Sequence, residues 1–342
     1  MIRVLIAEDS ASSRAYLKFI VDSAEDMEVV AVAENGEQAA ELTSRLRPDV
    51  VAMDIHMPVL DGCSATRQIM ASCPTPVVIV SSLVNGSASQ ETFRILEAGA
   101  VAAVPKPSGP KSKAAVEDRD KLLRTLRQVA GLDVCAPPQP SATQTVESSD
   151  KKATCRYKLV VVGASTGGPV ALQNMLRQIP ASFPLPILVV QHISPGFVPG
   201  MVQWLQNGCA LSLCVAENGQ SIKPGVVYFA PDDVHMGVTS AGRIVLKEGP
   251  MMHSVRPAVS YLFQSAARAY GGDVVGVLMT GMGRDGAAEL LTLQQQGAVT
   301  LLQDKESCVV YGMPGEAEQL GAGNYKLCPE RIGQQLIHLC CR

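Results

Sequence analysis

The sequence lacks an excess of either charge, a membrane-length apolar run and any CxxC pair. Its 29 Lys and Arg residues nearly balance 32 Asp and Glu residues, so the net charge of −3 gives no indication of a nucleic-acid partner. No apolar run approaches the ~20 residues of a transmembrane helix, and the N-terminus becomes acidic at Glu8, too early for a signal peptide. The ten cysteines are thinly spread. We therefore expect reduced thiols in a cytoplasmic chain that is not inserted in a membrane.

What the sequence does contain is two blocks in which apolar runs alternate with helical patterns. A length of 342 residues with 47% hydrophobic residues is enough for two domains with buried cores. Residues 132–155 are rich in Pro, Ser, Thr and charged residues and show no period, which predicts a flexible linker. We therefore expect domains at 1–131 and 156–342. Strands alternating with helices predict the α/β class, with a doubly wound parallel sheet in each domain.

Polar residues follow the predicted strands of the first block. The expected strands are Val4–Ala7, Val29–Ala33, Val50–Met53, Val77–Val80 and Val101–Val104, and the helical patterns between them include Ser12–Ala24 and Glu37–Leu46. Glu8 and Asp9 follow the first strand, Asp54 the third, Ser81 the fourth and Lys106 the fifth. The carboxyl ends of parallel strands meet at one edge of a sheet, so these side chains are expected together. Three neighbouring carboxylates would repel one another without a cation, and Mg²⁺ suits such an oxygen site.

This block resembles the receiver domain of two-component response regulators. The matches are the acidic pair Glu8 and Asp9, the phospho-acceptor Asp54 in MDIHMP, the hydroxyl switch position Ser81 and the lysine Lys106 in VPKP. The resemblance implies a flavodoxin-like fold, Mg²⁺ held by Glu8, Asp9 and Asp54, and transfer of a phosphoryl group from a histidine kinase to Asp54. Ala103 stands where many members carry an aromatic switch residue, so no aromatic rotamer switch is expected.

A serine on a glycine-rich turn opens the second block. Strands are expected over Leu159–Gly163, Ile187–Gln191, Val226–Ala230 and Val274–Thr280, helices over Gly168–Arg177, Pro199–Gln206, Pro257–Ala269 and Asp285–Gln296, and an antiparallel ribbon around His235–Lys247. Ser165 in GASTGGP fits G-x-S-x-G between a strand and a helix. The turn has no P-loop lysine and does not fit G-x-G-x-x-G, which argues against nucleotide binding. From this motif alone, a nucleophilic serine and an ordinary glycine turn both remain open.

The position of one histidine favours the nucleophilic serine. Of the five histidines, His192 directly follows a predicted strand, so it is expected at the same sheet edge as Ser165. The α/β-hydrolase order of Ser, Asp, His would instead require His338, which lies in the last helical pattern and is poorly placed for a base.

A carboxylate after another strand would complete a catalytic triad. Asp285 in TGMGRDG follows the strand expected at Val274–Thr280 and is the preferred third member. Asp232 and Asp233 follow the strand at Val226–Ala230 and remain alternatives.

These motifs, in this order, resemble the catalytic domain of chemotaxis-type protein-glutamate methylesterases. The matching segments are GASTGGP at 163–169, QH at 191–192 and TGMGRDG at 280–286. The resemblance implies a Rossmann-like α/β serine hydrolase in which Ser165 is the nucleophile, His192 the general base and Asp285 the residue that orients the imidazole. It implies no cofactor for the ester reaction, and the backbone N–H groups near Thr166 and Met282 are the candidates for the oxyanion hole.

The resemblance also implies a substrate class. It points to glutamate γ-methyl esters, and glutamines, on methyl-accepting chemoreceptors, in a phosphorylation-regulated pathway of chemotaxis adaptation. A receiver-controlled esterase acting on small-molecule esters is the alternative enzyme, and a phosphate sink or scaffold the non-enzymatic one. The second block shows no compact helix-turn-helix, which argues against a DNA-binding output. Two segments, His192–Pro195 and Met251–Val255, depart from the family pattern, and we expect both near the substrate cleft.

Overall fold

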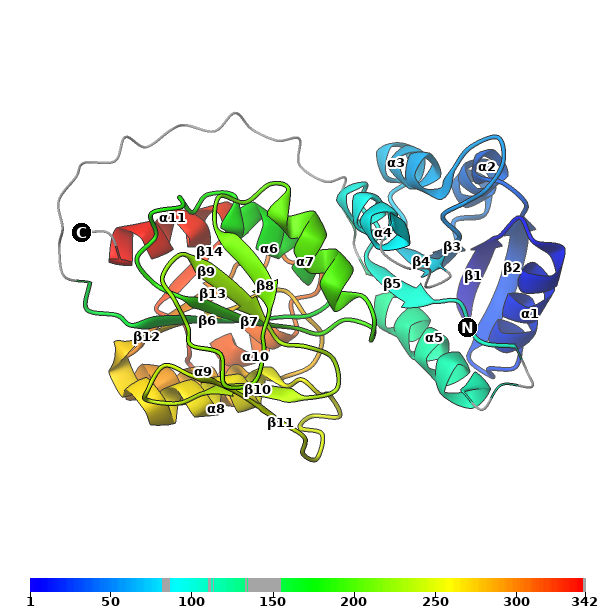
Figure 1. Ribbon diagram of the computed structural model, residues 1–342. Coiled ribbons are helices and arrows are strands. Elements are labelled where there is room, and N and C mark those ends of the chain that lie inside the picture. Colours follow the sequence, from blue (N-terminus) through cyan, green and yellow to red (C-terminus); the bar gives the residue numbers. More distant parts are fainter. Residues whose placement is uncertain (82–86, 110–111, 113, 133, 135–154, 341–342) are drawn as a thin grey trace. The chain divides into compact units, whose positions relative to one another are not determined.

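The computed structural model describes residues 1–81, 87–109, 112, 114–132, 134 and 155–340 (Figure 1). The chain divides into two compact units, Met1–Thr143 and Gln144–Arg342. The expected linker at 132–155 lies almost entirely outside the described residues, and the domain boundaries around it stay a prediction. Among the described residues, no helix combines the length and the apolar character needed to cross a membrane.

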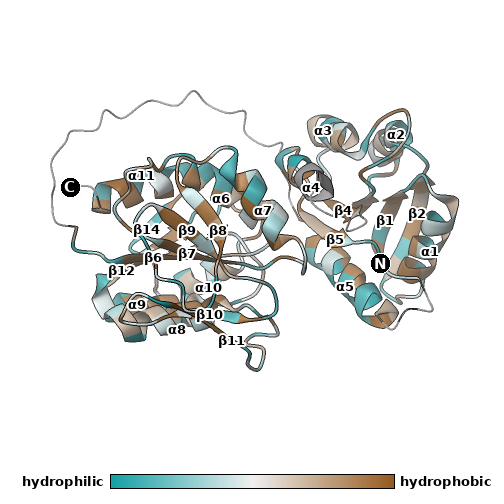
Figure 2. Ribbon diagram, viewed as in Figure 1, coloured by the Kyte–Doolittle hydropathy of each residue, from teal (hydrophilic) through white to brown (hydrophobic). Residues whose placement is uncertain are grey.

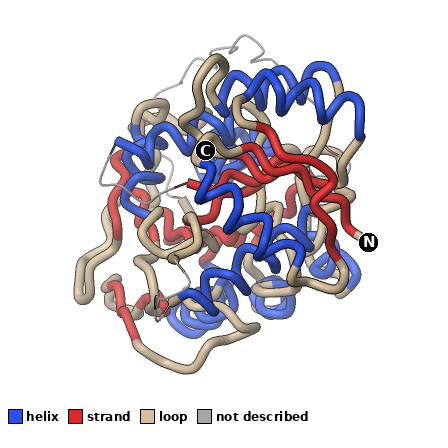
Figure 3. The backbone as a smooth tube through the Cα atoms, turned by 90° about the vertical axis from the view of Figure 1, so that its right-hand side faces the viewer, coloured by secondary structure: helices blue, strands red, loops and turns tan. Residues whose placement is uncertain are grey.

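The first unit is a five-stranded parallel sheet in the order β2-β1-β3-β4-β5. The strands are β1 (Ile2–Ala7), β2 (Met27–Ala33), β3 (Val50–Met53), β4 (Val77–Ser81) and β5 (Ala102–Pro105). The helices are α1 (Ala11–Asp22), α2 (Gly36–Leu46), α3 (Gly62–Ser72), α4 (Ser87–Glu97) and α5 (Ala115–Val129). Helices α2, α3 and α4 neighbour one another on one face, and α1 and α5 lie together on the other. Near the chain's N-terminus, Figure 3 shows the red strands running side by side between blue helices.

Burial and capping explain why these segments form these elements. Every residue of β3 and β4 is buried, as expected for parallel strands covered on both faces. The Asn35 side chain accepts the N–H of Gln38 at the start of α2, and Asp61 accepts the N–H of Ser64 at the start of α3. Each cap satisfies a helix N–H that has no partner within the helix.

The second unit is a seven-stranded parallel sheet in the order β14-β13-β12-β6-β7-β9-β8. Its strands are β6 (Leu159–Ala164), β7 (Ile187–Gln191), β8 (Ser212–Val215), β9 (Val226–Phe229), β12 (Val274–Leu278), β13 (Val299–Gln303) and β14 (Tyr325–Leu327). An antiparallel ribbon joins β10 (His235–Val238) to β11 (Ile244–Lys247). Strand β6 lies between β7 and β12, so the strand order reverses direction beside it, which is where α/β sheets place their sites.

Helices cover both faces of this sheet. They are α6 (Gly168–Leu176), α7 (Val198–Gln206), α8 (Val259–Tyr270), α9 (Ala287–Gln295), α10 (Met313–Gln319) and α11 (Pro329–Cys340), with a short 3₁₀ helix at Gly271–Asp273. Helices α6, α7 and α11 lie on one face and α8, α9 and α10 on the other (Figure 1). The strands of both units are mostly apolar, whereas the helices also carry hydrophilic residues (Figure 2).

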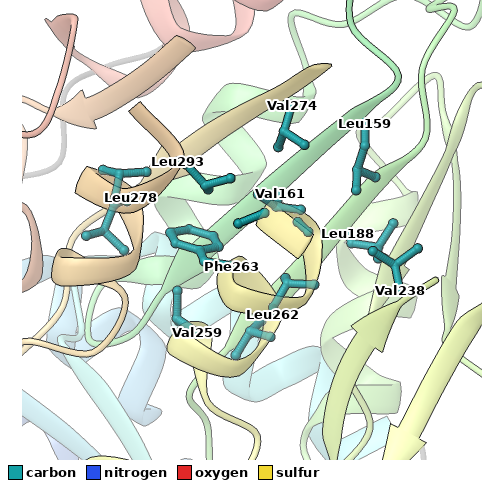
Figure 4. Close-up of a cluster of buried hydrophobic side chains, with 14 of the residues drawn as sticks. Leu159, Val161, Leu188, Val238, Val259, Leu262, Phe263, Val274, Leu278 and Leu293 are labelled. Atoms are coloured by element: carbon teal, nitrogen blue, oxygen red, sulfur yellow. The ribbon is translucent and has the colours of Figure 1, made fainter. Parts of the chain in front are cut away.

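A buried core between β6 and α8 holds helix α8 in place. Residues Val259, Leu262 and Phe263 of α8 are fully buried, and Figure 4 shows them beside Val161 of β6. Their spacing of three and four places them on one stripe of the helix. Helix α8 therefore has a fixed position over the central strands.

The expectation of two parallel-sheet α/β folds is confirmed, and the antiparallel ribbon lies where it was expected. Strands β8, β13 and β14 were not among the strands expected from the sequence. A helix was expected to begin at Asp285, whereas α9 begins at Ala287, so Asp285 lies on the preceding turn. The eight cysteines within the described residues form no disulfide bonds.

Candidate catalytic and phosphorylation sites

The first unit brings its predicted polar residues together at the strand ends. Lys106 Nζ lies 2.8 Å from Asp54 Oδ2 and 2.9 Å from Glu8 Oε2. The other oxygen of Asp54 accepts the N–H of Ile55 at 2.7 Å. Ser81 ends β4 as a buried residue, and its carbonyl accepts the backbone N–H of Lys106 at 2.8 Å. The carboxylates of Glu8 and Asp54 and the ammonium group of Lys106 thus lie together at the strand ends, with the backbone of Ser81 beside them.

The carboxylates of this pocket fit a hard divalent cation. Glu8, Asp9 and Asp54 each offer an oxygen, and these atoms lie within 4.8 Å of one another. Burial raises the pKa of Glu8, although the hydrogen bond from Lys106 opposes this effect. Burial would lower the pKa of Lys106, but its hydrogen bonds to Asp54 and Glu8 outweigh burial and raise it. The donor set is all oxygen and carries several negative charges, which is the chemistry that Mg²⁺ prefers.

In the second unit, Ser165 directly follows β6 on a tightly packed turn. Its N–H donates to the carbonyl of Thr280 at 2.9 Å, and its own carbonyl accepts the N–H of Gly168 at 2.7 Å. A Cβ at position 281 would lie 2.6 Å from the Cβ of Ser165, so only glycine fits beside the serine. The turn is therefore held between the ends of β6 and β12.

His192 directly follows β7, the neighbouring strand, and its N–H donates to the carbonyl of Ala164 at 2.9 Å. Its ring Nε2 lies 3.0 Å from Asp285 Oδ2. Because Nε2 faces Asp285, the other ring nitrogen, Nδ1, is the one left for a serine hydroxyl. The structure thus brings the predicted base and the preferred carboxylate together beside the strand that carries Ser165.

Helix α8 holds the carboxylate of Asp285. The residue is only 3% exposed, and it accepts the N–H of Val259 at 2.7 Å and of Ser260 at 2.9 Å. Burial acts to raise the pKa of Asp285, but its hydrogen bonds with His192 and Ser260 outweigh burial and lower the pKa below its usual value. An ionised, fixed carboxylate is what is needed to orient an imidazole and stabilise its cation.

The rival residues lie elsewhere. Asp232 accepts the N–H of Gly196 at 2.7 Å and so ties down a loop. Asp233 is exposed with a φ of 60°, and His338 is exposed on α11. Among the candidate aspartates, Asp285 is the one whose carboxylate lies beside the His192 ring in the described part of the chain.

Two backbone N–H groups near the serine have no acceptor within the part of the chain that the structure describes. Among the hydrogen bonds of the described residues, the N–H groups of Thr166 and Met282 donate none. The Thr166 carbonyl accepts the hydroxyl of Thr280 at 2.9 Å, which fixes the turn, and Met282 is 46% exposed. These two positions therefore remain the candidates for an oxyanion hole.

Comparison with known proteins matches each of the two units to a protein family. The family described as CheB methylesterase matches residues 160–336, and the response regulator receiver domain matches residues 4–129. The chain is 44% identical to "Protein-glutamate methylesterase/protein-glutamine glutaminase 1" of Syntrophus aciditrophicus, over 99% of this chain and 98% of that relative. The chain belongs to the CheB methylesterase family.

Further members of the CheB methylesterase family support the match. A relative from Thermotoga maritima with the name "Protein-glutamate methylesterase/protein-glutamine glutaminase" is 38% identical over 99% of this chain and 98% of its own length. The crystal structure of the Thermotoga maritima CheB methylesterase catalytic domain matches with a TM-score of 0.52 at 38% identity, covering 54% of this chain and 98% of that one. The resemblance of the sequence to receiver and methylesterase families is confirmed.

This CheB-family chain has a polar cleft close in sequence to the candidate residue Asp285, and no motif of the sequence had indicated it. The cleft measures about 610 Å³ and is lined by His253, Ser254, Gly283, Arg284, Tyr311, Gly312, Gly315, Glu316 and Gln319. Gly283 and Arg284 lie between Met282 and Asp285 in the chain, so the cleft begins next to the site. His253 and Ser254, with φ of 52° and 65°, form a two-residue turn closed by backbone bonds between Met252 and Val255. His253 and Ser254, from the segment Met251–Val255, thus line this cleft, and the expectation that the segment lies near the substrate stays a prediction.

Proposed function

We propose that the protein hydrolyses glutamate γ-methyl esters, and deamidates glutamines, on methyl-accepting chemoreceptors in the cytoplasm, under control of phosphorylation at Asp54. The observation that carries the proposal is the pairing of His192 with the buried carboxylate of Asp285 beside the Ser165 turn. The names of two relatives that match over 99% of this chain, which call them protein-glutamate methylesterases and protein-glutamine glutaminases, support the substrate class.

In the acylation step, Ser165 Oγ attacks the ester carbonyl carbon while His192 takes the hydroxyl proton. The negative oxygen of the tetrahedral intermediate is stabilised by the N–H groups of Thr166 and Met282. When the C–O bond breaks, His192 returns the proton to the leaving methoxide, and methanol departs. The product is a glutamyl ester of Ser165, and Asp285 keeps the imidazole oriented throughout.

Deacylation repeats the same chemistry with water. His192 takes a proton from water, whose oxygen attacks the glutamyl carbonyl, and then returns a proton to Ser165 Oγ as the acyl bond breaks. A free glutamate side chain is released. A glutamine side chain reacts in the same way, with ammonia leaving in place of methanol, so deamidation requires no additional residue.

Phosphorylation uses the separate pocket of the first unit. A carboxylate oxygen of Asp54 attacks the phosphorus of a phosphohistidine on the partner kinase, and the histidine nitrogen leaves. Lys106, 2.8 Å from Asp54, supplies a positive charge to the transferred group. Mg²⁺ held by Glu8, Asp9 and Asp54 would neutralise charge on the phosphoryl oxygens.

The character of the cleft favours a protein substrate over a small ester. Pockets for small molecules are mostly apolar and enclose their ligand. The cleft beside Asp285 is lined by glycines and by polar or charged side chains, among them Arg284 and Glu316. Such a surface suits a charged protein segment that presents one ester to Ser165.

The decisive experiment incubates the purified protein with radiomethylated receptor membranes from its own source and measures released methanol. We expect methanol release from the membranes to exceed hydrolysis of a panel of soluble methyl esters at matched ester concentration. Faster turnover of the soluble esters would support the small-molecule alternative. Absence of methanol release from the membranes would contradict the proposal.

Magnesium is expected to stabilise the protein through the acidic pocket. At 100 times its dissociation constant, Mg²⁺ should add about 2.7 kcal/mol to the free energy of unfolding of the first unit. Asp9 is exposed, so Asp9→Asn should leave the fold intact while removing most of the gain. Thermal unfolding in a Mg²⁺ titration measures this, with the exposed Glu25→Gln as control. An unchanged Mg²⁺ response in Asp9→Asn would exclude this residue as a ligand.

The receiver is expected to inhibit the esterase until it is phosphorylated. Asp54 and Ser165 belong to separate compact units, so the phosphoryl group must act through an interaction between units and not through the ester chemistry. Shifting a closed population from 99:1 to 1:99 would need about 5.5 kcal/mol, more than one phosphoryl group is expected to supply, so activation should be partial. A fragment beginning at Tyr157 should be faster than the unphosphorylated chain.

Initial rates on methylated receptor measure this for three species: the fragment, the full chain, and the full chain with a small-molecule phosphodonor and Mg²⁺. The third should lie between the first two. A fragment no faster than the unphosphorylated full chain would rule out inhibition by the receiver.

A further inference from the structure

One buried side-chain amide connects the backbone of the serine turn to that of the histidine turn. Gln191, the last residue of β7, is 4% exposed. Its Nε2 lies 2.8 Å from the carbonyl oxygen of Ser165 and 2.8 Å from the carbonyl oxygen of His192. Both partners are acceptors, so the NH₂ group must face them, since the reversed amide would place its oxygen against two carbonyl oxygens.

The surroundings of this amide show that stability alone does not account for it. The Gln191 Oε1 atom is buried and has no hydrogen-bond partner among the described residues. A buried acceptor without a partner is unfavourable for folding. A Cβ at position 168 would lie 2.0 Å from this oxygen, so the glycine of the serine motif leaves the room that the amide occupies. The fold thus accommodates an amide whose evident contacts are the two carbonyls.

We propose that Gln191 is a positioning residue for the serine chemistry, an inference that rests on the proposed function. Ser165 and His192 lie on turns that leave two different strands, β6 and β7. The bridging NH₂ group fixes the distance between the two turns and therefore the approach of the Ser165 hydroxyl to the imidazole. Misplacement of reacting groups by about 1 Å costs about 10²-fold in rate. Gln191 is buried, so its effect on the reaction is exerted through the two turns.

The test replaces Gln191 by Met, which has a similar length but no donor, and by Glu, which has the same shape but sets a carboxylate against the two carbonyls. Turnover of methylated receptor and reaction with a fluorophosphonate serine probe are both measured per labelled Ser165. We expect kcat per labelled site to fall about 10²-fold in Gln191→Met and further in Gln191→Glu, with KM changed less than about threefold. The probe reaction should slow in parallel while final labelling stays complete.

A matched control is Gln173→Met, which removes another buried glutamine amide, on α6. It should lower thermal stability without lowering kcat per labelled site. A purely structural role for Gln191 predicts a smaller labelled fraction with wild-type turnover per labelled site, and that result would overturn the proposal. A rise in KM at unchanged kcat would overturn it as well, because it would indicate substrate contact.

Two further measurements keep the result unambiguous. If Gln191→Met does not fold, Gln191→Asn retains the NH₂ group on a shorter side chain that cannot span both carbonyls, and the same loss of kcat is expected. The probe reports on Ser165 and His192 whatever the natural substrate is. A wild-type protein that reacts with the probe but releases no methanol would therefore contradict the proposed substrate and leave the Gln191 measurement intact.

Discussion

Ser165→Ala is expected to abolish methyl-ester hydrolysis, with a loss of about 10⁶-fold in kcat, as for a serine nucleophile in a triad. The variant lacks the side-chain oxygen that forms the acyl intermediate, and the alanine that takes its place directly after β6 has no nucleophilic atom. Phosphorylation of Asp54 should be unchanged, because this residue lies in the other compact unit. Methanol release and phosphate incorporation from a small-molecule donor, measured on one preparation, test both statements.

Ser240→Ala removes an exposed hydroxyl from the same unit and should retain wild-type turnover. Turnover that persists in purified Ser165→Ala, at a level above one part in a thousand, would refute the assignment of the nucleophile. Loss of phosphorylation in the same variant would instead indicate a folding defect.

Asp285→Asn is expected to lower kcat by about 10⁴-fold, the loss that follows when a triad aspartate becomes an amide. The Asn NH₂ group cannot accept a hydrogen bond from His192 Nε2, so the imidazole loses its tautomer and orientation. The fold should persist because the Asn oxygen can still accept one N–H at the start of α8. Steady-state rates on methylated receptor measure the effect.

Asp233→Asn, at an exposed rival position, serves as control and should be close to wild type. The opposite pattern would show that the wrong carboxylate was assigned.

Acid unfolding gives a second, independent measurement of the Asp285 carboxylate. A carboxylate with a lowered pKa stabilises the fold above its unfolded pKa and loses this contribution as pH falls through the folded value. The stability of Asp285→Asn should therefore fall less steeply than that of the wild type below about pH 4.

The central strands of both sheets were predictable because parallel strands covered on both faces are nearly continuous apolar runs. Strands β8 and β14 escaped prediction because they form the two edges of their sheet and are short and partly exposed. Strand β13 is buried and apolar, but periodicity alone does not separate such a short run from a helical segment.

The site was predictable to the extent that it depends on strand ends. Ser165 and His192 each follow a central strand directly, so their placement at one edge of the sheet required only the parallel pairing of β6 and β7. The choice of Asp285 over Asp233 could not be settled by spacing, because it depends on how the turn before α9 folds toward the start of α8. The bridge made by Gln191 could not be predicted either, because it also depends on how two turns fold toward each other. The sequence shows only that Gln191 precedes His192.

The contact between Asp285 and α8 affects how active and inactive members of this family can be told apart by sequence. The residue before the helix, Ala258, offers no side-chain acceptor, so Asp285 does the work of an N-cap from a distant part of the chain. A descendant that had lost its ester chemistry would still need an acceptor there to fold. Retention of this aspartate is therefore a poor marker of a working enzyme, and loss of Ser165 or His192 is the change that would identify an inactive one.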